Sequence, residues 1–492
     1  MSPFAGVLLA LLCGATVGAL AAAGPWLDWS LGLQRPSAAF PYLLSTGLVC
    51  VAGAGVWLLA RRPWRRLVGN ADYLMLFLLI LAPQISMGAR TDPSDLVLLV
   101  VLGVFAIRLA LDPEFEILLP NRLLMLVFFA ALVASVMVGG FGSLFSLLAI
   151  VKVVLTYYLV ANLIRTRRHA FYAMWFLVVI TSASALIGIV QEIAFLATGA
   201  ELVGFIPEVH RKYMYNPTFL GVMLRVPALT GWYIVLANLL VVAILFLANL
   251  LMYGVIDRPR ERRWAWWLLG LMSVGLFLTF SRSAELALFL GLALSIVVRW
   301  RHHLLQMGAA ASFLAVVAFA SGVVDKALDS IEEDLTYKGD LGVRIELLER
   351  GAKGFVYRHP WLGAGIGNAP EYTQNIDRWP VHNVFVLIAD EVGIFGLLAF
   401  LGVIATTVFK LLGYWIRATS ERDRGIIMAV LIALIALLIN LQFHPSYKDF
   451  FIFLLFGLFE GVSRAFGTQR PLLRRQGSPG GGTAIEPAVR GV

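Results

Sequence analysis

The sequence predicts an all-α fold, a polytopic bundle of transmembrane helices. Hydrophobic residues make up 60% of the 492-residue chain and charged residues only 14%, against about 45–50% and about 25% in soluble domains. Apolar windows of bilayer-spanning length, about 17–25 residues, recur along the chain. Because lipid offers the backbone no hydrogen-bond partner, these windows are expected to be helices.

The apolar windows divide the chain into about fourteen predicted spans. They cover residues 4–24, 38–60, 71–88, 95–111, 122–138, 144–164, 170–198, 228–254, 264–280, 284–299, 303–322, 383–412, 426–442 and 448–464. The first window lacks a basic leader and a clear cleavage site, so it is expected to be retained as a helix. Cys13 and Cys50 both lie in apolar windows and support neither a disulfide framework nor a metal site.

Arginine clusters support this count, because each one follows an even-numbered span. The clusters lie at 61–66, 165–168, 258–263, 299–301, 417–424 and 464–475. Positively charged loops of membrane proteins face the cytoplasm, so both termini are expected to be cytoplasmic. The net charge of +9 therefore indicates cytoplasmic loops rather than a nucleic-acid partner. The same alternation places loops 199–227, 281–283 and 325–383 outside.

The longest of these loops, residues 325–383, is where function is expected, because long loops in compact chains are usually functional. It carries ten acidic and seven basic residues. Apolar residues at helical spacing predict a helix over 342–350. The glycine-rich run 363–367 is incompatible with regular helix and predicts a compact turn.

These features divide the chain into five parts. They are two N-terminal transmembrane helices (1–66), a transmembrane core (67–322), the large loop (323–382), C-terminal transmembrane helices (383–465) and a cytoplasmic tail (466–492). Glycine and proline dominate the end of the tail, which is expected to be disordered.

Arg282 is the first candidate site residue, because it lies in the short turn Ser281-Arg282-Ser283 between two apolar windows. An arginine at that depth costs about 2–3 kcal/mol unless it reaches the interface or is paired. It is therefore either a snorkelling side chain or part of an anion site for a lipid-linked phosphate. The anion site is favoured, because a guanidinium donates two parallel hydrogen bonds to phosphate.

Arg344 and His382 are the next candidates. Arg344 lies in the predicted loop helix, where a surface ion pair with Glu346 or Glu349 is the alternative to a ligand role. His382 stands at the outer end of the following span. An imidazole accepts a proton near neutral pH, so His382 is a candidate base, with a satisfied interfacial histidine as the alternative.

Two polar residues follow His382 and are expected to support it. Asn383 is placed either to cap the next helix or to orient the imidazole ring. Glu391 lies about two turns into the apolar helix. A carboxylate inside a membrane segment is a functional candidate by default.

The other outer segments supply weaker candidates. Arg211, Lys212 and Arg225 share one outer loop, and His444 and Lys448 lie in the last outer turn. A basic cluster beside a membrane often contacts lipid headgroups, so lipid contact and substrate binding both stay open for these residues.

Several well-known catalytic motifs are absent from the sequence. It contains no Gly-x-x-x-x-Gly-Lys-Ser/Thr loop, no His-Glu-x-x-His and no Gly-x-Ser-x-Gly. The acidic triplet 332–334 is expected to be a solvated face rather than a cation site. The sequence therefore predicts no cofactor, no metal and no ATP-driven reaction.

The candidate residues belong to motifs in a fixed order. Phe280-Ser281-Arg282-Ser283 joins two spans, and the long loop then carries Arg344. After it come His359-Pro360-Trp361-Leu362-Gly363-Ala364-Gly365-Ile366-Gly367-Asn368, His382-Asn383-Val384-Phe385 and Glu391-Val392-Gly393-Ile394-Phe395-Gly396. In motif order, spacing and outer placement, residues 145–465 resemble the O-antigen ligase and O-antigen polymerase (Wzy-type) superfamily of bacterial glycosyltransferases.

The resemblance implies a GT-C-like bundle that transfers a glycan on the periplasmic face of the bacterial inner membrane. The implied donor is a glycan on undecaprenyl pyrophosphate. The implied acceptor is a hydroxyl of lipid A core, for a ligase, or of another lipid-linked glycan, for a polymerase. The implied chemistry is metal-independent and inverts the anomeric centre.

The resemblance also assigns roles to the candidates. His382 is expected to be the base, with Arg282 and Arg344 as ligands of the pyrophosphate. The expected substrate-binding and supporting residues are Arg225, Arg211, Lys212, Asn383 and Glu391. Neutralising arginines would stabilise the charge that develops on the leaving pyrophosphate.

The chain departs from the family pattern in two places. Members of the family usually have about a dozen spans, so the first two predicted spans are an N-terminal addition. The segment 225–231 follows the family pattern only loosely, which leaves the role of Arg225 open. A ligase is the first expectation, then a polymerase, then a protein O-oligosaccharyltransferase. A transporter or flippase is the alternative of another class, and a structural scaffold is the last. Transporters gather polar residues at mid-membrane, whereas these gather at an outer edge.

Overall fold

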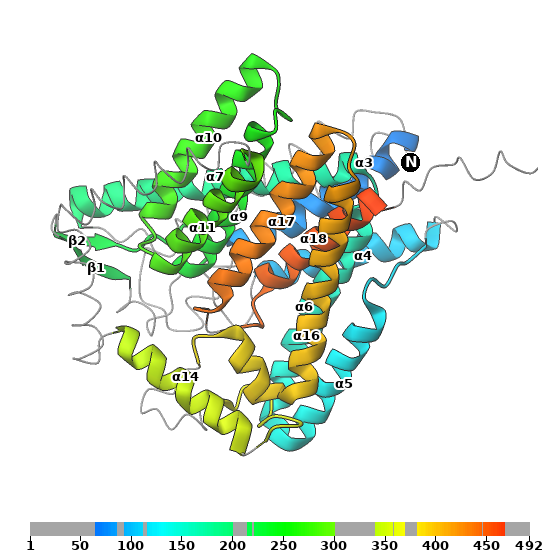
Figure 1. The fold of residues 1–492 in the computed structure, drawn as a ribbon, viewed down its shortest axis with the longest axis vertical. Coiled ribbons are helices and arrows are strands. Elements are labelled where there is room, and N and C mark those ends of the chain that lie inside the picture. The colour runs from blue at the N-terminus through cyan, green and yellow to red at the C-terminus, as the bar shows by residue number, and fades with distance from the viewer. Residues whose placement is uncertain are drawn as a thin grey trace, which may run out of the picture.

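The computed structural model describes residues 64–85, 93–111, 116–199, 214–218, 221–300, 340–357, 359–369, 381–444 and 446–467. These residues form a bundle of α-helices with one small β-hairpin (Figure 1). The predictions that lie outside the described residues concern the spans 4–24, 38–60 and 303–322, the acidic triplet 332–334, the tail from 476, and Arg211 and Lys212.

The helices begin and end close to the predicted spans. The first group comprises α3 (Trp64–Leu81) with the 3-10 turn η2 (Ala82–Ile85), α4 (Pro93–Leu111), α5 (Arg122–Gly139), α6 (Phe141–Leu163) and α7 (Arg167–Thr198). The second comprises β1 (Tyr215–Thr218), β2 (Gly221–Leu224), α9 (Tyr233–Met252), α10 (Pro259–Phe277) and α11 (Arg282–Arg299). The third comprises α14 (Asp340–Tyr357), α16 (Val384–Arg417), α17 (Glu421–Leu441) and α18 (Phe450–Gly467).

Seven of the described helices are long and apolar enough to cross a membrane, namely α5, α6, α7, α9, α16, α17 and α18. Each predicted span that falls within the described residues coincides with a helix. The prediction of a bundle with several membrane-spanning helices is thus confirmed. The antiparallel β1–β2 hairpin was not predicted, and it pairs Tyr215 with Leu224.

The core of the bundle lies around α9, α17 and α18, whose apolar windows are 83%, 78% and 89% buried. Several polar side chains in this core are paired, because burial away from water makes a missing partner costly. Asn440 donates to Asn238 at 2.8 Å, and Asn249 donates to Ser295 at 3.0 Å. By contrast, only 28% of the α5 window is buried, so α5 lies at the periphery of the described bundle.

Three of the predicted arginine clusters, at 165–168, 299–301 and 417–424, meet at one end of the bundle, which we call the arginine-rich end. Arg167 pairs with Asp423 at 2.5 Å, which joins the start of α7 to α17. Arg299 pairs with Glu421 at 3.2 Å, which joins the end of α11 to the start of α17. These contacts place the three clusters on a common side of the bundle.

Helix α16 is broken at Gly393, whose φ of 81° and ψ of −177° are not helical. The predicted span 383–412 is therefore two pieces, a short arm (384–392) and a long arm (394–417). The long arm packs along α5, where the rings of Phe128 and Phe400 lie 5.9 Å apart. The upright helix labelled α16 in Figure 1 is this long arm.

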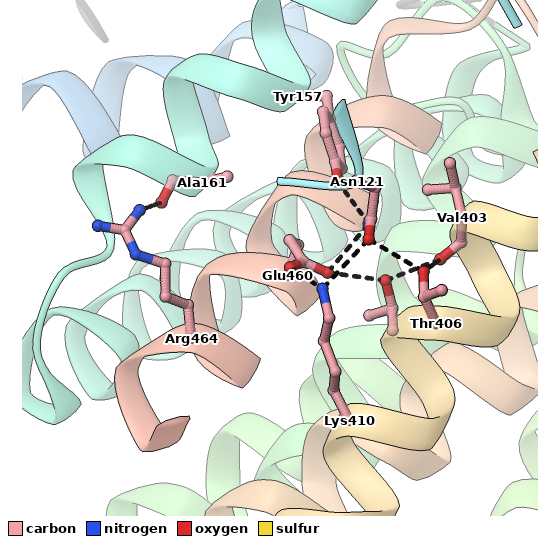
Figure 2. A network of polar contacts seen from close by, with 9 residues as sticks. Asn121, Tyr157, Ala161, Val403, Thr406, Lys410, Glu460 and Arg464 are labelled. Atoms are coloured by element: carbon pink, nitrogen blue, oxygen red, sulfur yellow. Dashed lines mark hydrogen bonds and ion pairs between the residues drawn. The ribbon is translucent and has the colours of Figure 1, made fainter. Parts of the chain in front are cut away.

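A polar network anchors the long arm to α5, α6 and α18 (Figure 2). Lys410 Nζ lies 2.7 Å from Glu460 Oε1, and Thr407 donates to Glu460 Oε2 at 2.9 Å. Lys410 also donates to Asn121 at 3.1 Å, and Asn121 donates to the Tyr157 hydroxyl at 3.1 Å. Only 3% of the Glu460 side chain is exposed, so its charge depends on these partners.

Lys410→Met is therefore expected to destabilise the protein by about 3–5 kcal/mol, because it leaves the Glu460 carboxylate buried without its cation. Glu460→Gln should destabilise the protein less, because the Lys410 side chain that loses its partner is 37% exposed and keeps its hydrogen bond to Asn121. Thermal unfolding of the purified variants measures both effects. Equal melting temperatures for Lys410→Met and wild type would contradict this account of the network.

Candidate functional site

Arg282 is the first residue of α11 and lies directly after a tight turn. Helix α10 ends at Phe277, and Phe280 in the turn has a φ of 48°. Thr279 Oγ1 accepts the Ser281 N–H at 3.3 Å, which fixes the approach to α11. The predicted tight connection is confirmed, but the turn lies at 278–281, so Arg282 and Ser283 belong to α11. Arg282 is exposed at the end of the bundle opposite the arginine-rich end.

Arg225 follows strand β2 and lies beside the Arg282 turn. Its guanidinium donates to the Tyr233 hydroxyl at 3.0 Å and to Asn216 Oδ1 at 3.1 Å. The next residue, Val226, donates its N–H to the Leu278 carbonyl at 3.2 Å. This bond joins the hairpin to the α10–α11 turn, so the segments that carry Arg225 and Arg282 are neighbours.

Helix α14 contains the predicted loop helix and extends beyond it in both directions. Two glutamates of α14 form ion pairs with basic residues one turn later in the helix, Glu346 with Arg350 and Glu349 with Lys353, each at 2.5 Å. The Lys353 hydrogen bond lowers the pKa of Glu349 from its ordinary value. Both pairs are surface pairs, which contribute little to stability.

The face of α14 that carries Arg344 is turned toward the start of α16. Arg344, Leu347 and Gly351 recur at helical spacing, and Leu347 is buried. A Cβ atom on Gly351 would lie 2.5 Å from the Val381 side chain, so α14 and the residue before His382 are in close contact. Arg344 lies two turns before this contact on the same face.

His382 immediately precedes the capping residue of α16. The Asn383 side chain accepts the N–H groups of Phe385 at 3.0 Å and Val386 at 3.1 Å, so it caps the helix, which is one of its two predicted roles. The same side chain donates to Gln442 Oε1 at 2.9 Å. His382 itself is half-buried, and its backbone position is set by the capped helix start.

The glycine-rich run forms a compact turn that binds the break in α16. Gly363, Gly365 and Gly367 have φ values of 71°, 100° and 90°, which favour glycine. The N–H of Ala364 donates to the Asp390 carbonyl at 2.8 Å, and the N–H of Gly365 donates to the Glu391 carbonyl at 3.1 Å. The loop thus satisfies carbonyls that the broken helix leaves free.

The backbones of the loop and the break approach too closely for side chains. A Cβ on Gly363 would lie 2.3 Å from the Glu391 carbonyl, and one on Gly393 would lie 2.2 Å from the Trp361 oxygen. A Cβ on Gly365 would lie 2.3 Å from Gly139 Cα at the end of α5. The glycine loop and the Gly393 break, which belong to separate sequence motifs, are therefore in direct backbone contact, and glycines on both sides permit it.

Glu391 lies at the end of the short arm and is almost fully buried. Its Oε2 accepts the Tyr447 hydroxyl at 2.8 Å and lies 3.1 Å from Lys448 Nζ. Burial first, and then the Glu391 charge, raise the pKa of Tyr447 well above its ordinary value, so Tyr447 stays a donor. In the sequence, Lys448 and Glu391 are separate candidates. The need of a buried carboxylate for a cation indicates that Glu391 has a basic partner, but it does not indicate which residue that partner is.

Residues 267–401 match the family model of the O-antigen ligase. The chain carries an O-antigen ligase-like domain. A search among curated proteins found no match. The O-antigen ligase-like domain begins within α10 and ends in the long arm of α16, so it includes Arg282, Arg344, the glycine loop and His382.

Helix α17 connects the two groups of candidate residues. It runs antiparallel to α11, because Arg299 meets Glu421 at one end while Gly291 approaches Ala436 farther along. The first residues of α11 therefore lie at the same end of the bundle as the C-terminus of α17, where Gln442 contacts Asn383. We call this end, opposite the arginine-rich end, the motif end of the O-antigen ligase-like domain.

The candidate residues that the structure describes all belong to the motif end. Besides His444 and Lys448 in the turn between α17 and α18, they come from three regions of the sequence. Arg225 and Arg282 lie on joined segments. Arg344 lies on α14, and His382, Asn383 and Glu391 lie in or beside the short arm. Within the described residues no group of three or more His, Cys, Asp or Glu side chains is arranged to hold a metal ion.

Proposed function

We propose that the protein transfers a glycan from undecaprenyl pyrophosphate to a sugar hydroxyl at the periplasmic face of the bacterial inner membrane. The observation that carries the proposal is the O-antigen ligase-like domain, whose separate motifs lie at one end of an apolar helical bundle. A lipid-linked donor suits this arrangement, because its glycan can reach the motif end while its polyprenyl chain stays in the membrane.

The arginines bind the donor pyrophosphate in this proposal. Arg282 and Arg344 are the ligands, with Arg225, Arg211 and Lys212 as further contacts. Pyrophosphate leaves readily once its charge is neutralised, and guanidinium groups supply that neutralisation as the charge develops. The large loop 323–382 forms a lid over the donor, and its glycine turn fixes the lid against α16.

His382 is the base in this proposal. The acceptor hydroxyl oxygen forms a bond to the anomeric carbon as the bond from that carbon to the pyrophosphate oxygen breaks. The hydroxyl proton passes to the His382 imidazole, and the electron pair leaves on undecaprenyl pyrophosphate. Attack on the face opposite the leaving group inverts the anomeric centre. Asn383 and Glu391 hold the elements around the base.

Lipid A core is the first choice of acceptor, which makes the protein a ligase. A second lipid-linked glycan, as for a Wzy-type polymerase, is the next, and a protein hydroxyl is the third. The full topology in this proposal has fourteen spans with both termini in the cytoplasm. The two spans within residues 1–66 are an addition to the transmembrane core.

The test is glycan transfer by the purified protein in EDTA. The donor is an undecaprenyl-pyrophosphate glycan, offered with lipid A core or alone. Transfer to lipid A core identifies a ligase, and lengthening of the donor glycan identifies a polymerase. A donor that stays intact with every acceptor would contradict the proposed function and favour a transporter. Activity that EDTA abolishes would contradict the metal-independent mechanism.

A further inference from the structure

The turn between α17 and α18, residues 442–449, contacts the short arm of α16 at both of its ends. At the start of the arm, Gln442 accepts a hydrogen bond from Asn383 at 2.9 Å. At the end of the arm, Tyr447 donates to Glu391 at 2.8 Å and Lys448 lies 3.1 Å from the same carboxylate oxygen. The arm between these contacts spans only nine residues, 384–392.

The 442–449 turn is itself held firmly. His444 Nε2 lies 2.7 Å from Asp449 Oδ2 across the turn, and the His444 ring meets Phe451 edge-on at 5.5 Å. His444 and Tyr447 are both buried. The turn connects α17 and α18, two of the most buried helices described, so it is tied to the core of the bundle.

The orientation of the short arm depends on contacts with residues outside α16. The break at Gly393 interrupts the helical hydrogen bonds that would otherwise orient the short arm relative to the long arm. The glycine loop holds the break itself through the Asp390 and Glu391 carbonyls. The direction in which the arm points from that break depends on contacts along the arm and at its start, next to His382.

We propose that the 442–449 turn is a two-point clamp that positions His382, with Gln442, Tyr447 and Lys448 as positioning residues. The inference rests on the proposed function, since it takes His382 as the base. A displacement of a catalytic group by about 1 Å costs up to about 100-fold in rate. Loosening either point of the clamp therefore lowers turnover without removing any substrate contact.

The test compares kcat and KM of purified variants with the lipid-linked glycan donor. Lys448→Met removes the cation and retains the bulk of the side chain. It is expected to lower kcat by about 10–100-fold, with KM changed by less than about threefold. Lys448→Arg should recover most of the loss, because it restores a cation at Glu391. Gln442→Ala tests the other point and should lower kcat in the same way.

Two control variants separate positioning from general instability. Lys410→Met loses an ion pair of the same kind at the far end of α16, and below its melting temperature it should keep the wild-type kcat. Lys353→Met loses an exposed pair on α14 and should match wild type in both activity and stability. A loss of kcat in Lys410→Met as large as in Lys448→Met would overturn the clamp.

The clamp and the proposed function fail in different ways. An inactive wild-type protein would overturn the proposed function. An active wild type together with an unimpaired Lys448→Met and an unimpaired Gln442→Ala would overturn the clamp alone. Loss of activity in Lys448→Met with full activity in His382→Ala would also overturn it, because the clamp would then act on another group.

Discussion

His382→Ala is expected to lower the rate of glycan transfer by about 10²–10⁴-fold, the usual contribution of a general base. The variant removes the imidazole at the start of the short arm but leaves the Asn383 cap, which holds the helix start. Donor binding should therefore be nearly unchanged. The rate of transfer by the purified variant under saturating donor gives the size of the loss.

His169 provides the matched control for this prediction. It lies near the start of α7 at the arginine-rich end, where its ring packs edge-on against Tyr73 at 4.8 Å. His169→Ala should keep the transfer rate of the wild type. A His382→Ala protein that folds normally and transfers at the wild-type rate would remove His382 from the mechanism.

Gly365→Ala is expected to destabilise the protein strongly, because it conflicts with the structure in two ways. The φ of 100° at this position is unfavourable for alanine by about 1–3 kcal/mol. The new Cβ would also lie 2.3 Å from Gly139 Cα, a contact with backbone that forces the loop away from α5. Overpacking of this kind costs a further 1–3 kcal/mol or so.

Thermal unfolding measures this loss, and Gly103→Ala is its control. Gly103 lies in α4 with nothing within 4 Å of its Cβ position, and alanine is the better helix former by about 1 kcal/mol. Gly103→Ala should therefore match or exceed the wild-type melting temperature. Equal melting temperatures for Gly365→Ala and wild type would show that the contact between the loop and α5 is not close in the folded protein.

Features that depend on local composition could be predicted from the sequence. The apolar windows gave helices at the expected places, because the length and apolarity of a segment suffice to select a helix in a membrane. The compact turn at Gly363–Gly367 followed from glycine spacing. The Asn383 cap followed from the residue type and its place before an apolar run.

Features that depend on a distant backbone could not be predicted in this way. A single glycine within an apolar helix is commonly tolerated, so Gly393 gave no signal of a break. The break is fixed by the approach of residues 360–365, whose backbone bonds to residues 390–394. Likewise, the sequence presents Glu391 and Lys448 as separate polar residues in different spans, and only the packing of α16 against the α17–α18 turn pairs them.

In the proposed mechanism Arg282 and Arg344, from two distant parts of the chain, act on one pyrophosphate. Their Gln variants, alone and combined, should be assayed for donor consumption in the purified protein. Each single variant is expected to lose at least about 10²-fold in the rate of donor consumption, as for one lost electrostatic donor. The double variant is expected to lose less than the product of the two single losses, because the residues act as a unit. Donor consumption at the wild-type rate by either single variant would contradict the shared site.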